Sequence, residues 1–299
     1  MSDKKPKVLV IAGPTASGKT SLSITLAKEF HGEVISADSR QIYKRLDIGT
    51  GKITKEEMQG VPHHLLDFRD PSQVYNASDF KNDASEKIIE ITNRKHLPII
   101  AGGTFFYVDT LLGRITSPEV PPNQKLREEL EKKSSKELYK LLLQKDPNRA
   151  KQMDPHNARR LIRALEITEA LGYVPNISTE KPYDVLTLGI KRDKEDLRTR
   201  FKARAQQWLA DGLMQEIEGL LQSGLSENRL REIGFEYLLA IELYKKEISE
   251  DTFLQKFVEK NWQYAKKQKM WLKRDESIVW IDADEVTKAK RLVEDFLKK

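Results

Sequence analysis

The sequence predicts an α/β fold in which helices flank a parallel β-sheet, with a helical insertion in the chain. Three observations lead to this prediction. Short apolar segments alternate with helical patterns, a glycine-rich loop follows the first apolar segment, and a basic helical stretch lies between two proline-containing breaks. Strands of a parallel sheet are apolar throughout because helices cover both faces of the sheet.

Apolar runs predict strands at 7–12, 33–36 and 97–101, with helices at 20–30 and 78–96 between them. Two later apolar runs, at 184–190 and 277–281, are expected to extend the same sheet. Three long helical patterns lie between these last two strands, at 194–222, 233–246 and 252–273.

Composition excludes several classes of protein. With 299 residues, 33% charged and 38% hydrophobic, the chain is typical of a soluble globular protein. The absence of cysteine excludes disulfides, thiolate metal sites and a cysteine nucleophile, and the five histidines lack the spacing of a zinc site. No apolar run approaches the roughly 18 residues that span a bilayer, and no signal peptide precedes the first strand. We therefore expect a cytoplasmic protein.

The glycine-rich loop "GPTASGKT" matches the pattern G-x-x-x-x-G-K-[ST] and lies between a predicted strand and a predicted helix. Glycines let the backbone N–H groups point at phosphate oxygens, Lys19 supplies a charge, and the Thr20 hydroxyl is a ligand for Mg²⁺. The core is therefore predicted to be P-loop NTPase-like, a class that includes ATP-binding proteins. The predicted diphosphate- or nucleotide-binding loop is Gly13, Pro14, Thr15, Ala16, Ser17, Gly18, Lys19 and Thr20.

Asp38 is the carboxylate closest to this loop in the predicted sheet. Strand 97–101 ends in Gly102-Gly103-Thr104 instead of the metal-binding Asp that many such proteins carry. Because parallel strands bring their carboxyl ends to one edge, Asp38 should lie near the loop. It is a candidate general base or metal-associated group. Ser39, Arg40 and Gln41 would then bind the substrate that accepts the transferred group. An Asp that only caps a turn explains the residue equally well.

The basic stretch is predicted to form a separate helical domain. We expect a core domain at 1–116 and 183–299 and a helical insertion domain at 117–182. Between residues 123 and 163 there are twelve Lys or Arg against six Asp or Glu, an excess equal to the net charge of +6 for the whole chain. A solvated helical face is the ordinary explanation, but this concentration of charge favours a polyanionic partner such as nucleic acid.

Five further segments carry a resemblance that covers nearly the whole chain. They are "SADSRQIYKRLDIGTGK", "VPHHLLDFRDPSQVYNASDF", "IIAGGTFFYVDTLL", "DPHNARRLIRALE" and "QYAKKQKMWLKR". Together with the phosphate loop, they resemble the tRNA dimethylallyltransferases, also called tRNA isopentenyltransferases.

The resemblance implies transfer of a dimethylallyl group from dimethylallyl diphosphate to the exocyclic N-6 amine of an adenosine in tRNA. That adenosine is the one 3′ of the anticodon (position 37), in tRNAs that read codons beginning with U. The loop would then hold diphosphate rather than ATP, with Mg²⁺ as cofactor. The implied partners are dimethylallyl diphosphate and the tRNA anticodon stem-loop, with no membrane, and we expect a monomer.

The resemblance also implies roles for single residues. Asp38, Lys19, Thr20 and Arg231 would be catalytic, with Asp38 as general base and Arg231 at the diphosphate. Arg200 and Arg204 also fit family positions, although a helix-surface salt bridge explains them as well. The residues implied to contact tRNA are Asp38, Ser39, Arg40, Gln41, Thr104, Arg160 and Arg163.

The chain departs from the family pattern in two places. Phe235-Glu236-Tyr237 stands where Tyr, a basic residue and then Gln or Glu are usual, and Lys267 and Met270 replace Arg and Thr. Three other functions remain open: a nucleotide or small-molecule kinase, an RNA-binding module with an inactive loop, and a prenyltransferase for free adenine nucleotides. The basic insertion argues against the last of these, because a mononucleotide needs no such surface.

Overall fold

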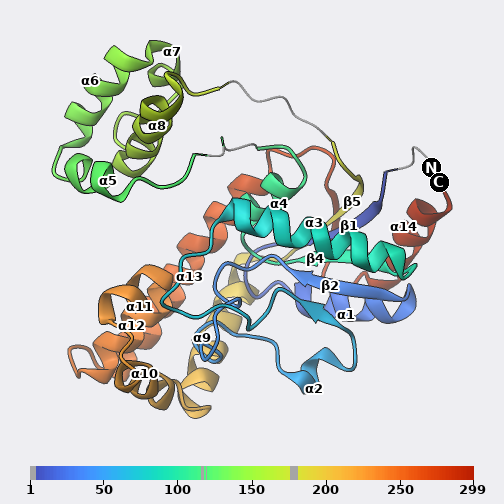
Figure 1. Cartoon of the computed structure of the whole chain (residues 1–299). Coiled ribbons are helices and arrows are strands. Elements are labelled where there is room, and N and C mark those ends of the chain that lie inside the picture. The colour runs from blue at the N-terminus through green and yellow to red at the C-terminus, as the bar shows by residue number, and fades with distance from the viewer. Residues whose placement is uncertain (1–4, 116–117, 119, 176–180) are drawn as a thin grey trace. The chain divides into compact units, whose positions relative to one another are not determined.

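The computed structural model describes residues 5–115, 118, 120–175 and 181–299, and the chain divides into two compact units (Figure 1). The first unit comprises Met1–Gly113 and Lys181–Lys299 and contains the β-sheet. The second unit, Arg114–Glu180, is built from helices in its described part. No helix among the described residues is long and apolar enough to cross a membrane.

The sheet is parallel throughout, with the strand order β3-β2-β4-β1-β5-β6. This arrangement confirms the predicted fold class. β1 lies at the centre between β4 and β5, so the phosphate loop that follows it leaves the middle of the sheet. The strands are β1 (Lys7–Ala12), β2 (Gly32–Ser36), β3 (His63–His64), β4 (Leu97–Ala101), β5 (Asp184–Lys191) and β6 (Val279–Asp282).

Each face of the sheet has its own apolar core. In β1, Val8 and Val10 pack on one side with α3 (Ala77–Asn93), whereas Leu9 and Ile11 pack on the other with α1 (Lys19–Glu29) and α14 (Val286–Lys298). Successive side chains of a strand point to opposite faces, so a strand buried on both faces must be apolar throughout. This explains the uninterrupted apolar sequence of β1.

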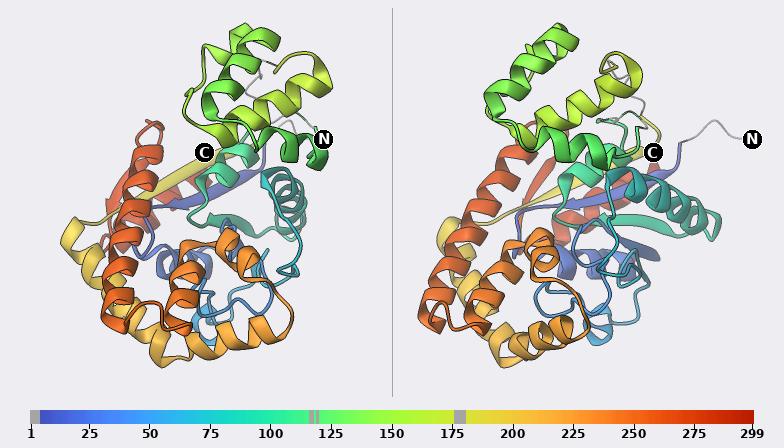
Figure 2. Two further views of the ribbon diagram at one scale, coloured as in Figure 1. Left: turned by 90° about the vertical axis from the view of Figure 1, so that its left-hand side faces the viewer. Right: turned by 60° about the vertical axis from the view of Figure 1, so that its left-hand side comes forward.

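Of the helices that follow β5, α13 (Glu250–Leu272) packs along α9 (Lys194–Ala210) (Figure 2). The prediction of one helix over 194–222 was wrong, because Gly212 adopts φ +100° and separates α9 from α10. The first unit's remaining helices are α2 (Lys55–Met58), α4 (Phe105–Leu111), α9 (Lys194–Ala210), α10 (Leu213–Gln222), α11 (Glu227–Ile233), α12 (Phe235–Tyr244) and α13 (Glu250–Leu272).

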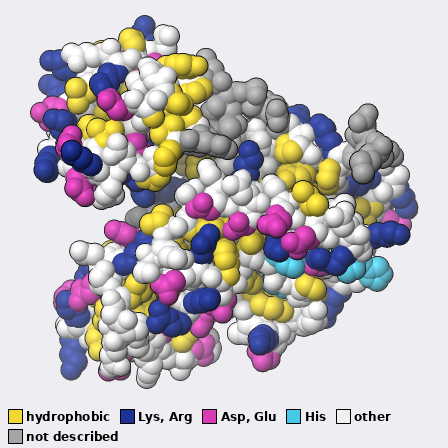
Figure 3. Space-filling view, in the orientation of Figure 1, with side chains coloured by type: hydrophobic (Ala, Val, Ile, Leu, Met, Phe, Trp, Pro, Cys, Tyr) yellow, Lys and Arg dark blue, Asp and Glu magenta, His cyan; other side chains and the backbone are white. Residues whose placement is uncertain are grey.

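The second unit has a small leucine-rich core built from Leu130, Leu138, Leu142, Leu161 and Leu165. On the face drawn in Figure 3, Lys and Arg side chains lie on its surface among acidic and apolar ones. Its helices are α5 (Gln124–Leu130), α6 (Ser135–Lys145), α7 (Pro147–Ala150) and α8 (Ala158–Leu171).

A buried carboxylate, Glu33 of β2, links this strand to His64 of the edge strand β3 and to the segment between α3 and β4. Its side chain is 4% exposed and accepts hydrogen bonds from His64 Nε2 (2.6 Å), His96 Nδ1 (2.7 Å) and Arg94 Nε and Nη2 (3.0 and 2.8 Å). Burial alone would raise the pKa of Glu33, but the hydrogen bonds from Arg94 and then the two histidines lower it to about 2. His64 therefore has a structural partner in the sheet.

We predict that Glu33→Gln lowers the free energy of unfolding by about 2 kcal/mol at pH 7, because the hydrogen bonds that Arg94, His64 and His96 donate to the buried carboxylate lose their negatively charged acceptor. The folded-state pKa lies below the ordinary value of 4.5, so this stabilisation is complete above pH 4.5 and is lost as the pH falls toward 2. Urea unfolding between pH 7 and pH 3 measures the difference. Glu86→Gln, at an exposed position of α3, is the control. A wild-type-to-variant difference that stays constant with pH would contradict the assignment.

Candidate active site

The phosphate loop ends at the start of α1 with the geometry of an anion site. Gly18 precedes the helix with φ +100°, offers no side-chain cap, and the first turn contains no acidic residue. The N–H groups of that turn are therefore available to an anion, and the helix dipole favours negative charge there. At Gly13 a Cβ would lie 2.7 Å from Ser17 Oγ, so the loop closes only around a glycine.

Two cations that are distant from each other in the sequence meet at this loop: Lys19, which belongs to it, and Arg204. Lys19 Nζ donates to the carbonyl oxygens of Gly13 (3.0 Å) and Pro14 (2.8 Å), and Arg204 Nη1 of α9 donates to Thr15 Oγ1 (3.1 Å). Burial lowers the pKa of Lys19 to about 8; Asp38 opposes this change and Arg204 adds to it. Burial also lowers the pKa of Arg204. An anion in the loop would relieve the repulsion between these cations.

Arg192, just after β5, also bonds to the phosphate loop. No motif in the sequence identified this residue. Its Nε donates to the Ser17 carbonyl oxygen (2.9 Å), and its Nη1 pairs with Asp196 (2.5 Å). Arg200 pairs with the same Asp196 at 2.9 Å and also lines the pocket. The salt bridge considered for Arg200 is therefore present, whereas Arg204 reaches the loop itself.

The second half of the site is built where β2 and β4 end side by side. Ala37 N–H donates to the Ala101 carbonyl, and Thr104 N–H donates to the Ala37 carbonyl (3.0 Å). A Cβ on Gly102 would lie 2.2 Å from that Ala37 oxygen, so only glycine allows the two chains to come this close. The contact places the turn after Asp38 beside Thr104.

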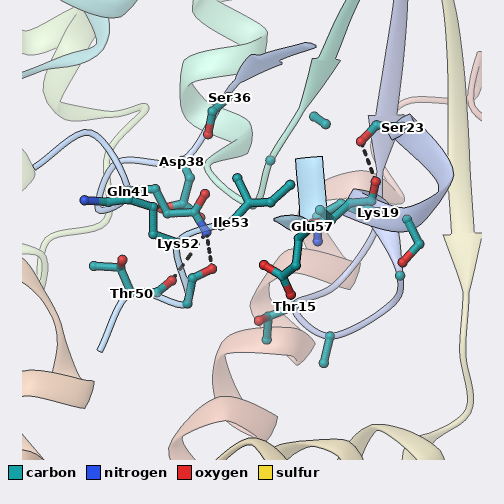
Figure 4. Close-up of a pocket in the computed structure, with 18 of the residues that line it drawn as sticks. Thr15, Lys19, Ser23, Ser36, Asp38, Gln41, Thr50, Lys52, Ile53 and Glu57 are labelled. Carbon is teal, nitrogen blue, oxygen red and sulfur yellow. Dashed lines mark hydrogen bonds between the residues drawn. The ribbon is translucent and has the colours of Figure 1, made fainter. Parts of the chain in front are cut away.

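Asp38 caps its own turn and also lines the pocket (Figure 4). Its Oδ1 accepts hydrogen bonds from the N–H groups of Arg40 (2.9 Å) and Gln41 (3.4 Å). Ser39 and Thr104 are joined through Thr104 Oγ1, which accepts from Ser39 N and donates to Ser39 Oγ. Asp38 can therefore cap its turn through Oδ1 and still present its carboxylate to the cavity.

Gln268 of α13 connects the two halves of the site. This 4%-exposed side chain accepts a hydrogen bond from Thr15 N (2.8 Å) through Oε1 and donates to the Gly103 carbonyl (2.9 Å) through Nε2. Tyr264, one helical turn earlier, donates to the same carbonyl (3.2 Å). In the sequence, only the segment "QYAKKQKMWLKR" as a whole pointed to this helix.

One cavity of about 1080 Å³ contains these groups. Its lining includes Lys19, Thr20, Asp38, Thr104 and Arg204, and in Figure 4 Ile53 is drawn between Lys19 and Asp38. Part of its wall is apolar, formed by Ile24, Val34, Ile53, Leu66 and Ala101.

The structure does not bring every expected residue to this cavity. Arg231 lies on α11, pairs with Glu227 of its own helix (3.6 Å) and is absent from the lining, so its expected contact with diphosphate is not supported. Arg40 lines the cavity, but its guanidinium is held by Glu236.

Within the second unit, the two arginines expected to contact tRNA differ. Arg163 donates to the buried Glu166 (2.7 Å) and to the Val120 carbonyl (2.9 Å), so its guanidinium already has partners inside the unit; its contact with tRNA stays a prediction. Arg160 is exposed on α8 and stays a predicted tRNA contact.

A family model described as IPP transferase matches residues 41–275, most of the chain. The chain belongs to the IPP transferase family. Curated relatives include tRNA dimethylallyltransferases of Staphylococcus carnosus (39% identical, covering 94% of this chain and 93% of the relative) and Anoxybacillus flavithermus (36%, covering 97% and 95%).

Solved structures of the IPP transferase family agree with the fold. The tRNA isopentenylpyrophosphate transferase of Bacillus halodurans is 32% identical with a TM-score of 0.74, covering 98% of this chain and 97% of that one. A eukaryotic dimethylallyltransferase acting on tRNA is 29% identical with a TM-score of 0.84, covering 98% of this chain and 79% of that chain.

We predict that Gly102→Ala lowers the free energy of unfolding of this IPP transferase family member by about 3 kcal/mol, because the new methyl group overlaps the Ala37 backbone. Gly219→Ala, on the exposed face of α10 with open space around it, should instead raise it by up to about 1 kcal/mol. Chemical denaturation compares the two variants. Equal effects would show that the close approach at Gly102 is unimportant.

Proposed function

We propose that this chain transfers a dimethylallyl group from dimethylallyl diphosphate to the exocyclic N-6 amine of the adenosine 3′ of the anticodon (position 37) in tRNAs that read codons beginning with U. The observation that carries the proposal is that one cavity contains both an anion-binding loop and Asp38. Alkylation of an amine by an allylic diphosphate needs a place for the departing diphosphate and a proton acceptor, and these two groups supply them.

The loop receives the leaving group. When the C1–oxygen bond of the allylic diphosphate breaks, the electron pair leaves with diphosphate, and the five-carbon unit becomes a delocalised cation. Lys19, Arg204 and the N–H groups at the start of α1 face the oxygens on which negative charge increases. Charges that are already in place stabilise a transition state more effectively than mobile water does.

The site also fits Mg²⁺. Among the described residues, no group of three or more His, Cys, Asp or Glu side chains is placed to hold a metal. Mg²⁺ commonly takes only one or two protein oxygens and completes its shell with substrate phosphates and water. Thr20, exposed at the cavity, supplies an oxygen of this kind. When bound, Mg²⁺ would neutralise charge on the diphosphate.

Asp38 receives the proton of the acceptor. The amine of adenine is a weak nucleophile because its lone pair is conjugated with the ring. As the N–C1 bond forms, the amine loses a proton, and a carboxylate within reach accelerates this step by about 10²–10⁴-fold. The hydrogen bonds from Arg40 N and Gln41 N hold Asp38 Oδ1 in place for this role.

The apolar wall suits the five-carbon chain. Ile24, Val34 and Ile53 are each at most 9% exposed and belong to the core that packs between the sheet and α1. A dimethylallyl group placed there loses water on one side while its reactive carbon stays between the loop and Asp38.

An RNA base reaches such a cavity only after it leaves its stack, which an anticodon loop permits at low cost. Ser39, Gln41 and Thr104, which surround Asp38, are polar groups able to contact the base or its neighbours. The excess of basic residues between positions 123 and 163 of the second unit supports an RNA partner.

Incubation of unmodified tRNA with dimethylallyl diphosphate and Mg²⁺, followed by nuclease digestion and mass spectrometry, tests the proposal. We expect a gain of one C₅H₈ unit on the adenosine next to the anticodon and release of one diphosphate. A parallel incubation with ATP should give no phosphorylated product. ATP turnover without any gain on tRNA would support the kinase alternative instead.

We predict that Asp38→Asn lowers the turnover number by about 10²–10⁴-fold, because it removes the proton acceptor, while the dissociation constant for tRNA changes by less than about threefold. Asp295→Asn, at an exposed position of α14, is the matched control and should behave as wild type. Loss of tRNA binding in parallel with activity would make Asp38 an anchoring residue.

The affinity for dimethylallyl diphosphate should fall as the pH rises through about 8, because the Lys19 ammonium is lost there. Above that pH the decrease approaches about tenfold per unit, as expected for one linked proton. Isothermal titration between pH 7 and pH 9.5 measures it. Lys19→Met should bind more weakly with a nearly flat profile; a decrease of the same steepness in that variant would assign the titration to another group.

A further inference from the structure

The Arg40 side chain points into the core unit and is held there from several sides. Its Nη1 lies 2.5 Å from Glu236 Oε2 at the start of α12, and the two side chains are 22% and 7% exposed. The guanidinium carbon lies 5.4 Å from the ring centre of Phe235 and 5.6 Å from that of Tyr264. Two aromatic rings and limited exposure to water strengthen such an ion pair.

The packing around this pair is close. A Cβ on Gly234 would lie 2.8 Å from Glu236 Oε2 and 3.0 Å from Arg40 Cζ, so α12 meets the guanidinium directly through a glycine. Burial opposes the charge of Arg40, but Glu236 more than compensates and raises its pKa. Removing one partner would leave the other charge buried without compensation, which is strongly destabilising to the local arrangement.

The same residue is bonded to the proposed general base through its backbone. Arg40 N donates to Asp38 Oδ1 at 2.9 Å. The position of the Arg40 backbone therefore determines the orientation of the Asp38 carboxylate, and the Arg40 side chain is fixed by Glu236.

The next residue of α12 holds the other end of the same segment. Tyr237 OH donates to Glu216 Oε1 (2.8 Å), and the Glu216 carboxylate accepts hydrogen bonds from the N–H groups of Asp47, Ile48 and Gly49. The first turn of α12 thus fixes both the turn at Asp38 and the loop that begins at Asp47. Phe235-Glu236-Tyr237 is one of the two places at which the sequence departs from the pattern of the family that it resembles.

We propose that Glu236 is a positioning residue for the transfer reaction, which holds the Arg40 guanidinium inside the core unit and thereby aims the Asp38 carboxylate. Arg40 is then an internal anchor and not a ligand for an RNA phosphate. The inference rests on the proposed function for its kinetic consequence, but its structural part can be tested without any turnover.

Kinetics of Glu236→Gln test the first part. This substitution keeps the shape and removes the charge. We expect the turnover number at saturating tRNA and dimethylallyl diphosphate to fall by about tenfold or more. The dissociation constant for tRNA and its salt dependence should stay within about twofold of wild type, because no phosphate contact changes. Glu232→Gln, the same change at a 67%-exposed side chain on α11, is the control and should match wild type.

The proposal would be overturned if the turnover number were unchanged while the tRNA affinity was altered and the slope of log affinity against log salt concentration changed by about one. That result would mean that Glu236 competes with an RNA phosphate for Arg40. Thermal unfolding by circular dichroism identifies a variant that fails to fold. Glu236→Asp is the second variant for that case: partial recovery of turnover relative to Glu236→Gln is expected, and no recovery with intact folding would contradict the role of the carboxylate.

Nuclear magnetic resonance of ¹⁵N-labelled protein tests the structural part. The guanidinium signal of Arg40, assigned by its loss in Arg40→Lys, should exchange slowly with water in wild type and rapidly in Glu236→Gln. Addition of an anticodon stem-loop RNA should leave it in place. A signal that exchanges rapidly in the free protein and becomes protected only with RNA would overturn the proposal, whether or not the protein transfers a dimethylallyl group.

Discussion

Strands β2 and β4 end side by side, and the contact between the Ala37 carbonyl and Gly102 at that point determines where the acceptor half of the site lies. A methyl group on Gly102 would overlap Ala37, and the N–H of Thr104 bonds to the same carbonyl. The turn that carries Asp38 is therefore locked to the turn that carries Thr104. Because β1 is the neighbour of β4 on its other side, the phosphate loop lies within reach of both.

The site brings opposite charges into one cavity. The phosphate loop, Lys19 and Arg204 form a cationic surface, and burial lowers the pKa of Lys19 to about 8. Asp38 supplies a carboxylate to the same cavity. Gln268 bonds to both halves, so a single side chain of α13 links the phosphate loop at Thr15 to the turn at Gly103.

Some of this arrangement follows from the sequence because it depends on local spacing. The pattern from Gly13 to Thr20 identifies the loop, and the edge rule for parallel sheets places Asp38 near it. Three residues that contact the same loop, Arg192, Arg204 and Gln268, lie more than 170 positions further along the chain. Local sequence spacing cannot predict contacts over such a separation.

The contacts of charged residues that have a possible partner within the protein were harder to predict. Arg163 was expected to face RNA, but Glu166 one helical turn away is buried and takes up its guanidinium. Sequence spacing gives the face of the helix but not the burial of the neighbour. Arg40 illustrates the same difficulty, because its carboxylate partner, Glu236, lies far away in the sequence and only the folded structure identifies it.

A crystal structure with an anticodon stem-loop RNA and the unreactive thio-analogue of dimethylallyl diphosphate tests the central claim most directly. We expect the diphosphate oxygens at the N–H groups of the loop, the reactive carbon between Lys19 and Asp38, and an Asp38 oxygen within hydrogen-bond distance of the flipped adenine N-6. A diphosphate bound elsewhere, or an adenine amine that contacts no group of Asp38, would contradict this account.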